Sequence, residues 1–345
     1  MNVIEGPYLR DILDQPRALA ATIDALAVGD NVLSMARKLR AGAYARVILT
    51  GMGSSLHALV PLEIALAEAG FTPLLVETSE LVHSMPRLLD AGSLIVAVSQ
   101  SGRSAEIVRL LEIRSADAAL IGVTNTARSP LGQRSDAVVL TRAGEEFSVS
   151  CKTYVTALAA LQILGSALRG CNPEVVRREL GQSAPAVAQY LEDWRDHVHQ
   201  LAGLLDGVRH LFLAGRGTSL AAARTGALIL KESAHVPVEG MSCAAFRHGP
   251  MEMLAADVLV LIFSGDEQAQ PMNLRLCDEI RKAGGRAELA GAGATTGALS
   301  LPSVPPNLLP ILEILPVEML TLALASLKGI EAGRFSIASK VTTIE

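Results

Sequence analysis

The chain has 345 residues, which is too long for one ordinary hydrophobic core and suits two domains with extensions. Half of the residues are hydrophobic and only 3% are aromatic, so the core must be aliphatic, and this composition excludes intrinsic disorder. A net charge of −5 without a basic block argues against nucleic-acid binding, because that binding depends on neutralising phosphates.

The start of the chain and its cysteines favour a reducing compartment. Residues 1–16 carry acidic side chains and no apolar core, which is not the pattern of a signal peptide. The four cysteines lie far apart without a CxxC pair, which is typical of reduced thiols. We therefore expect a cytoplasmic protein.

An internal repeat organises the chain. Residues 46–58 match residues 210–222 in an apolar run, a Gly-x-Gly-[Ser/Thr]-Ser turn and an Ala/Leu-rich segment. Each copy predicts a buried strand, a glycine turn and a helix. Further apolar runs follow at 93–102 and 257–266, and a third at 118–125. Strands that alternate with helix-length segments predict parallel βαβ units, so we expect a duplicated α/β domain.

We divide the chain into a helical lead (1–30), a first α/β domain (31–170), a linker helix (171–200), a second α/β domain (201–330) and a tail (331–345).

One apolar stretch, Leu308 to Leu327, has the length of a membrane span. It contains two glutamates and two prolines, which are costly in lipid. We predict a helix buried in a core or a subunit interface, and no membrane partner.

The first glycine turn, residues 51–56, favours an anion site. It has Leu56 where the dinucleotide fingerprint GxGxxG needs its third glycine, although Glu77 could imitate the ribose-binding acid of an NAD site. A helix start offers free N–H groups and a partial positive charge, to which Ser54 and Ser55 would add hydroxyls. The alternative is that both serines are ordinary helix caps.

The loop after the next strand is a more specific signal. Residues 98–104, Val-Ser-Gln-Ser-Gly-Arg-Ser, bring hydroxyl, amide and backbone donors together before another predicted helix. In a parallel sheet both loops leave the carboxyl ends of strands, where such sheets bind ligands, and two donor-rich loops suit one phosphate. The repeat has Phe263-Ser264-Gly265-Asp266 instead, whose acid would repel phosphate. Only the first half is therefore predicted to bind phosphate.

These motifs carry a family resemblance that spans nearly the whole chain. The matching stretches, in the family's order, are Asp11-ILDQP, Gly51-MGSS, Ser99-QSGRS, Ser148-VSCKTY, Leu230-KES, Phe246-RHGPMEML and Ser339-KVTTIE. They resemble tandem sugar-isomerase (SIS) domain proteins, such as the isomerase half of glucosamine-6-phosphate synthase. The resemblance implies two tandem SIS domains, each a parallel sheet flanked by helices in a flavodoxin-like three-layer αβα fold.

The resemblance also implies the site residues. Glu232 matches the carboxylate that moves a proton between C1 and C2 of the sugar. His248 matches a ring-opening histidine that comes from the neighbouring subunit in relatives, and Lys340 matches a lysine on the tail that closes over the substrate. Taken singly, these residues have ordinary interpretations as a helix-end carboxylate, a structural histidine and a solvated charge. The implied substrate-binding residues are Gly53, Ser54, Ser55, Ser99, Gln100, Ser101, Ser104, Ser150 and Lys152.

The chemistry of an aldose–ketose shift agrees with this set. It needs a base that takes a proton and returns it to the adjacent carbon, and a buried carboxylate can do so. Ring opening needs a separate proton donor and acceptor, which histidine supplies near pH 7. Neither step requires a metal or a cofactor, and we expect none.

Departures from the family narrow the function. The chain begins directly with the isomerase region and without the glutaminase domain of the synthase. Ile229 stands where the synthase has a lysine, and Gly333-Arg334-Phe335-Ser336 replaces the usual Asp-x-Pro-Arg before the tail. These differences favour a phosphosugar isomerase, an amino-sugar-phosphate deaminase or a deglycase over a glutamine-dependent synthase.

Two further expectations concern function and assembly. The alternative to an enzyme is a regulatory protein that binds a sugar phosphate without chemistry, although the chain carries no helix-turn-helix domain. The apolar helix at 308–327, with a histidine that acts across subunits in relatives, predicts a homodimer with shared active sites.

Overall fold

The computed structural model describes residues 2–337 and Lys340. These residues form two compact units. The N-terminal unit consists of residues 17–146 and 152–181 with Ile337 and Lys340, and the C-terminal unit consists of the chain up to Pro16 with residues 147–151 and 182–336.

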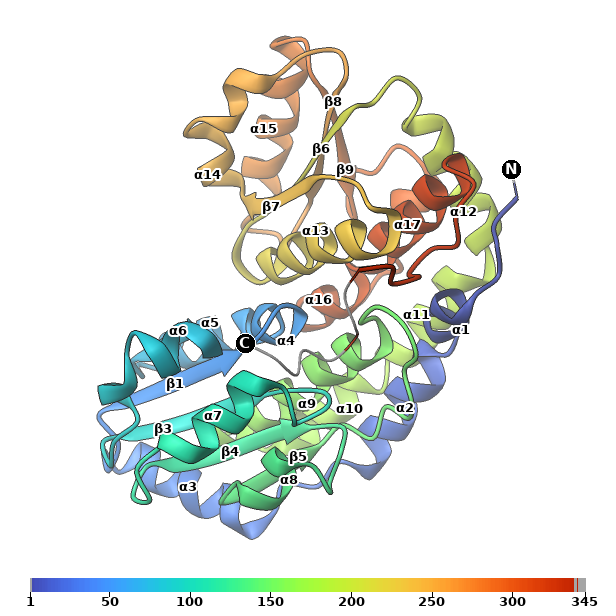
Figure 1. The fold of residues 1–345 in the computed structure, drawn as a ribbon. Coiled ribbons are helices and arrows are strands. Elements are labelled where there is room, and N and C mark those ends of the chain that lie inside the picture. The colour runs from blue at the N-terminus through green and yellow to red at the C-terminus, as the bar shows by residue number, and fades with distance from the viewer. Residues whose placement is uncertain (1, 338–339, 341–345) are drawn as a thin grey trace. The chain divides into compact units, whose positions relative to one another are not determined.

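The N-terminal unit contains a parallel sheet in the order β2-β1-β3-β4-β5 (Figure 1). Its central strands β1 and β3 are buried along nearly their whole length, as a parallel sheet covered on both faces requires. The strands are β1 (Arg46–Gly51), β2 (Pro73–Glu77), β3 (Ser93–Val98), β4 (Ala119–Thr124) and β5 (Ala137–Leu140).

Helices cover both faces of this sheet (Figure 1). On one face, α6 (Thr78–His83), α7 (Ala105–Ile113) and α8 (Pro130–Arg134) enclose an aliphatic core that includes Ile95 and Leu110. The other helices of this unit are α3 (Asp30–Arg40), α5 (Val60–Glu68), α9 (Lys152–Arg169) and α10 (Pro173–Leu180), together with α2 (Gln15–Ala25), α4 (Ser54–His57) and the short η1 (Pro86–Leu88).

The C-terminal unit repeats the arrangement with a parallel sheet in the order β7-β6-β8-β9. The strands are β6 (His210–Gly215), β7 (Val238–Ser242), β8 (Val258–Phe263) and β9 (Arg286–Ala290). This order matches β2-β1-β3-β4, as the internal repeat predicts. Two parallel sheets flanked by helices confirm the predicted α/β class.

The helices of the C-terminal unit also lie on both faces of its sheet (Figure 1). One face carries α14 (Cys243–Arg247) and α15 (Gln270–Lys282) around a core with Phe212 and Phe246, and the other carries α13 (Leu220–Ala234) and α17 (Leu315–Leu327). The remaining elements are α1 (Pro7–Leu13), α11 (Ser183–Glu192), α12 (Trp194–Leu204), α16 (Leu309–Leu312), η2 (Gly217–Ser219), η3 (Pro250–Met253), η4 (Gly297–Leu299) and η5 (Pro306–Leu308).

Two predicted helices are divided. Residues 171–200, expected as one linker helix, contain α10, α11 and the greater part of α12. α10 ends with Gly181 as its C-cap. Pro185, in the first turn of α11, has no N–H and so cannot continue the backbone hydrogen bonds of α10. The helix expected after Gly53 is likewise split into α4 and α5, because Pro61 lies at the start of α5.

The apolar stretch at 308–327 is a core element of the C-terminal unit. The longer segment Pro306–Leu327 has the length and composition of a membrane span, but 89% of its most apolar window is buried inside the protein. A second stretch, formed by α2 and α3 together, passes the same test only across a bend of 77°. Both glutamates of the stretch accept hydrogen bonds: Glu318 Oε2 from Gln15 Nε2 and Glu313 Oε1 from Ser219 Oγ, each at 2.7 Å. This agrees with the predicted buried helix.

The second carboxylate, Glu313, gives this unit a pH-dependent stability. Burial raises the pKa of its carboxyl from 4.5 to about 7; a hydrogen bond from Ser219 opposes the shift and the charge of Asp266 adds to it. Because the folded pKa lies above the unfolded one, the stabilisation is complete below pH 4.5 and is lost as the pH rises through 7.

We expect wild type to lose up to about 3 kcal/mol of unfolding free energy between pH 5 and pH 8 from this group. Glu313→Gln should flatten that part of the profile, as measured by urea unfolding across the range. Equal slopes in wild type and variant would contradict the assignment.

Candidate functional site

The two loops predicted to bind phosphate follow neighbouring strands. β1 and β3 pair in parallel with Gly51 opposite Val98, so their carboxyl ends lie together. From β1 the chain continues to β2 on one side, and from β3 to β4 on the other. This reversal of strand order is the place where open α/β sheets bind ligands.

Glycines allow the first loop to lie close to the sheet. A Cβ atom on Gly51 would lie 2.9 Å from the backbone nitrogen of Leu56 and 3.1 Å from the carbonyl oxygen of Val98, so only glycine fits there. Gly53 has a positive φ of 50°, which other residues rarely adopt. The turn then places Ser54, buried, and Ser55, half-buried, at the start of α4.

The second loop is held in one shape by its own backbone and by β4. Ser99 N–H donates to the carbonyl of Val123 at 3.0 Å, and Gly102 N–H donates to Ser99 Oγ at 3.1 Å. Gly102 has φ 63°, and a Cβ there would lie 2.1 Å from Ser129 Oγ. Ser99 and Ser101 are buried and Gln100 and Ser104 half-buried, so the structure brings the hydroxyls of both loops to the same end of the sheet.

A third group of predicted residues lies at the start of α9. Lys340 Nζ forms an ion pair of 2.9 Å with Glu146 Oε2, whose side chain is completely buried. Glu146 also accepts hydrogen bonds from the backbone N–H and the hydroxyl of Thr153, at 2.9 and 2.6 Å. Lys152, the first residue of α9, is buried beside Thr153. Glu146 therefore holds Lys340 against the first turn of α9.

Sequence reasoning missed Glu146, and its replacement tests the pair. Glu146→Gln keeps an oxygen for Thr153 but cannot balance the charge of Lys340. The lysine that is predicted to close over the substrate should then be misplaced, and on that prediction we expect kcat to fall about tenfold or more. Affinity for an unreactive substrate analogue should change little. The exposed neighbour Glu145→Gln is the matched control. A Glu146→Gln variant with the wild-type kcat would refute the role of Glu146 in positioning Lys340.

Glu232 lies, half-buried, in the last turn of α13. The helix ends at His235, which has a left-handed conformation with φ 51°. Lys328 Nζ donates to the carbonyls of Ala234 and His235, each at 2.9 Å, and a cation there complements the helix dipole. Lys328 thus fixes the helix end that carries the predicted base.

The segment containing Ser150 belongs to the same unit as Glu232. Gly333 N–H donates to the carbonyl of Ser233, next to Glu232, at 3.1 Å, and the Gly333 carbonyl accepts a hydrogen bond from Ser148 Oγ. A Cβ on Gly333 would lie 2.4 Å from Ser148 Oγ, so the close packing requires glycine. Gly333 is the first residue of the stretch that stands in place of the family's Asp-x-Pro-Arg pattern. It therefore links the start of the tail to the segments that contain Ser148 and Ser233.

His248 is exposed and follows α14. Glu232 is distant from it within one chain, because α13 runs back from the carboxyl end of β6 towards the start of β7, whereas His248 follows the carboxyl end of β7. The structure thus does not bring the predicted base and the predicted ring-opening histidine together in one C-terminal unit. A histidine supplied by a second subunit is compatible with that separation.

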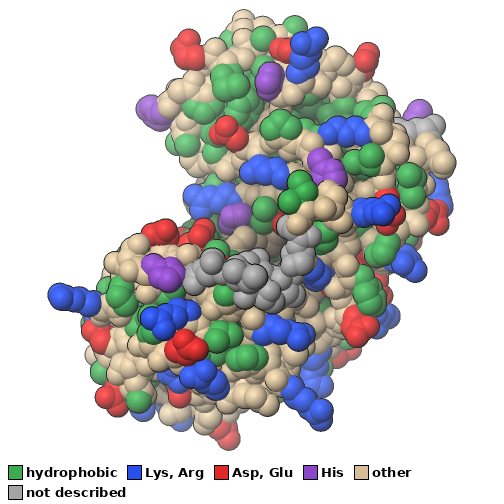
Figure 2. All heavy atoms as spheres, viewed as in Figure 1, with side chains coloured by type: hydrophobic (Ala, Val, Ile, Leu, Met, Phe, Trp, Pro, Cys, Tyr) green, Lys and Arg blue, Asp and Glu red, His purple; other side chains and the backbone are tan. Residues whose placement is uncertain are grey.

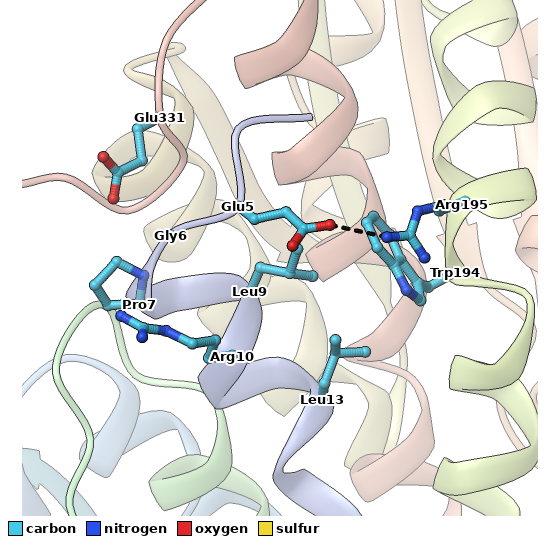
Figure 3. A pocket seen from close by; sticks show the side chains of 9 residues that line it. All are labelled: Glu5, Gly6, Pro7, Leu9, Arg10, Leu13, Trp194, Arg195 and Glu331. Carbon is cyan, nitrogen blue, oxygen red and sulfur yellow. Dashed lines mark hydrogen bonds and ion pairs between the residues drawn. The ribbon is translucent and has the colours of Figure 1, made fainter. Parts of the chain in front are cut away.

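A pocket of about 570 Å³ lies elsewhere in the C-terminal unit (Figure 3). Its wall includes Trp194, on which the Arg195 guanidinium stacks at 4.3 Å, and Glu5, which pairs with Arg195 at 2.8 Å. Both charged groups of that pair are exposed, so the pair adds little stability. No predicted site residue lines this pocket.

The described residues contain no group of three or more His, Cys, Asp or Glu side chains that could hold a metal ion. On the face shown in Figure 2, Lys and Arg side chains lie among Asp and Glu side chains.

Comparison with known proteins identifies the family. The sequence profile of the SIS domain matches residues 43–167 and 204–287, which contain the two sheets apart from residues 288–290 of β9. The chain belongs to the SIS domain family.

Several SIS proteins are similar to this chain along nearly its full length. Glutamine–fructose-6-phosphate aminotransferase (isomerizing) of Pyrococcus horikoshii is 30% identical over 98% of this chain, which spans 57% of that enzyme's length. A provisionally assigned phosphosugar isomerase from Silicibacter pomeroyi is 28% identical with a TM-score of 0.79, covering 95% of this chain and 99% of that one. Glucosamine-6-phosphate deaminase of Thermotoga maritima, 18% identical, shares the fold with a TM-score of 0.79, covering 98% and 100%.

Proposed function

We propose that this SIS protein is an enzyme that shifts a proton between C1 and C2 of a sugar phosphate or amino-sugar phosphate. The observation that carries the proposal is the pair of donor-rich loops at the carboxyl ends of β1 and β3. The relatives support it, because their names include a fructose-6-phosphate aminotransferase, a phosphosugar isomerase and a glucosamine-6-phosphate deaminase.

The phosphate is bound by the N-terminal unit in this proposal. Buried hydroxyls donate hydrogen bonds to its oxygens, and buried Lys152 adds a positive charge. The loops are already held in shape by Gly51 and Gly102, so little ordering is needed on binding. The substrate-binding set remains Gly53, Ser54, Ser55, Ser99, Gln100, Ser101, Ser104, Ser150 and Lys152.

The proton transfer is assigned to Glu232. Its carboxylate takes the proton from one carbon of the open-chain sugar, which gives an enediolate. It returns that proton to the adjacent carbon, while a hydroxyl proton moves between O1 and O2. His248 of a second subunit moves the proton between ring oxygen and anomeric hydroxyl during ring opening, and Lys340 covers the open chain. The isomerisation neither gains nor loses protons or electrons overall, so the reaction consumes no cofactor.

Release of an amine is the favoured outcome for an amino-sugar substrate. Ile229, one turn before Glu232, is completely buried, so this chain places an apolar side chain where the synthase has a lysine. After the proton shift, water adds to the imine carbon and ammonia leaves, which gives the ketose phosphate. Ammonia release and simple isomerisation share the same C1–C2 step.

A panel of hexose and hexosamine 6-phosphates, followed by proton NMR and an ammonia assay, tests the proposal. We expect turnover of at least one member and none of the same sugars without phosphate. Binding without turnover across the whole panel would favour the second candidate, a regulatory sugar-phosphate sensor. The presence of Glu232, His248 and Lys340 together favours the enzyme, because a sensor has no need of a proton-transfer set.

The proposed protein is a cytoplasmic homodimer. Cys151, Cys243 and Cys277 are buried and form no disulfide among the described residues, which suits a reducing compartment. The need for a second subunit's His248 makes the dimer the active form. Light scattering at micromolar concentration should give about twice the mass of the chain, and a monomer with full activity would contradict the shared site.

A further inference from the structure

One segment of the chain binds the end of α13 at three successive carbonyls. Gly333 N–H donates to the carbonyl of Ser233 at 3.1 Å, and Lys328 Nζ donates to the carbonyls of Ala234 and His235, each at 2.9 Å. The final carbonyls of a helix have no partner within the helix itself. Residues 328–333, which we call the return segment, supply the missing donors.

The backbone at this helix end needs such support. His235 ends α13 with φ 51° and ψ 49°, which is the left-handed conformation that usually calls for glycine. Among the residues that the structure describes, His235 and Arg142 are the non-glycine residues with a positive φ. A side chain in this conformation carries a steric cost and persists where surrounding contacts enforce it. Lys328 provides two of those contacts.

The return segment is itself anchored at both ends. Lys328 is the C-cap of α17, a helix that is mostly buried and packs against α13 (Figure 1). At the other end, the carbonyl of Gly333 accepts a hydrogen bond from Ser148 Oγ, in the segment that also contains Ser150. The end of α13 is therefore held from a core helix and from a segment that carries a predicted substrate-binding residue.

We propose that Lys328 is a positioning residue for Glu232: it holds the left-handed end of α13 and so places the carboxylate of the same turn against the substrate. Glu232 lies three residues before His235, which is less than one helical turn, so its side chain moves when this end frays. Lys328 acts through the helix backbone in this proposal. The inference rests on the proposed function for the role of Glu232.

The test starts from Lys328→Met, which keeps the apolar stem and removes the ammonium group. We expect kcat for C1–C2 hydrogen exchange to fall about tenfold, because a base that is displaced by a fraction of an ångström loses its alignment with the carbon. KM and the affinity for an unreactive sugar alcohol 6-phosphate should stay at their wild-type values. Lys328→Arg retains a cation with several donors and should keep nearly the wild-type kcat.

Lys231→Met is the matched control. Lys231 is exposed and lies in the same last turn of α13, so this variant removes the same charge from the same helix end. Its kcat should equal that of wild type. An equal loss in Lys231→Met and Lys328→Met would overturn the proposal, because the general charge of the helix end would then explain the effect.

His235→Gly tests the step through the backbone. Glycine adopts the left-handed conformation without the steric cost, so the helix end depends less on Lys328. We expect the double variant His235→Gly with Lys328→Met to recover at least about threefold in kcat over Lys328→Met alone, a coupling that independent sites do not show. Strictly additive effects of the two substitutions would contradict the proposal.

A measurement without substrate separates this proposal from the proposed function. Amide hydrogen exchange over residues 227–236, followed by mass spectrometry, should be about twofold to fivefold faster in Lys328→Met than in wild type. If no sugar phosphate is turned over, the proposed function fails, and this exchange still decides whether Lys328 holds the helix end. Unchanged amide exchange in Lys328→Met would overturn the inference, as would a wild-type kcat in that variant.

Discussion

Replacing Glu232 with glutamine is expected to abolish exchange of the substrate's C1 and C2 hydrogens with solvent deuterium. An amide has the shape of the carboxylate but cannot accept a proton at neutral pH, so the rate should fall by about 10² to 10⁴ or more. The end of α13 should keep its place, because Lys328 donates to the backbone carbonyls of Ala234 and His235, which the substitution does not alter. Proton NMR in deuterium oxide measures the exchange directly.

Binding separates loss of chemistry from loss of structure. Calorimetry with an unreactive sugar alcohol 6-phosphate should give nearly the same affinity for wild type and Glu232→Gln. Glu239→Gln, on the exposed side of β7, is the matched control and should exchange at the wild-type rate. Unchanged exchange in Glu232→Gln would remove this residue from the role of base.

Replacing Gly102 with alanine is expected to damage the phosphate loop and the stability of the N-terminal unit together. At φ 63° an alanine costs about 1–2 kcal/mol, and its Cβ would lie 2.1 Å from Ser129 Oγ. Ser129 caps α8 by accepting from Gly132 N–H at 3.1 Å, so its displacement costs about another 1 kcal/mol. We expect a total loss of about 2–3 kcal/mol in urea unfolding and at least a tenfold loss of phosphosugar affinity.

Gly42→Ala is the control for Gly102→Ala. It separates the cost of the left-handed backbone conformation from the cost of the clash between the new Cβ and Ser129. Gly42 has φ 75° in the same unit, and a Cβ there would meet nothing within 4 Å. Its variant should lose only about 1–2 kcal/mol and bind the phosphosugar normally. Equal effects of the two substitutions on binding would show that the position of Ser129 does not matter to the loop.

Local patterns in the sequence predicted the loops of both units correctly. Continuous apolar runs mark β1, β3, β6 and β8 because a parallel sheet covered on both faces has no polar side. Glycines follow two of them where the chain turns close to the sheet, and that requirement is local too. The duplication could be read from the same signals, and the matching strand orders of the two sheets agree with it.

Helix ends were harder to predict than helices. The segment 171–200 has helical character throughout, yet it is interrupted after Gly181 and again at Asp193. The effect of Pro61 on the helix after Gly53 is of the same kind. At Pro61 and Pro185 a missing backbone N–H interrupts the hydrogen bonds of the helix, and one such residue is a small signal beside the apolar pattern of the whole segment.

The sequence by itself determined the α/β class, the duplicated architecture and the two donor-rich turns, since each depends on residues that are close together in the chain. Only the tertiary structure decided which charged groups meet. Lys340 pairs with Glu146 across 194 residues, and Glu313 reaches Ser219 across 94. A buried charge or carboxyl must find a partner, but the path of the backbone decides which partner is within reach, and no periodicity records that path.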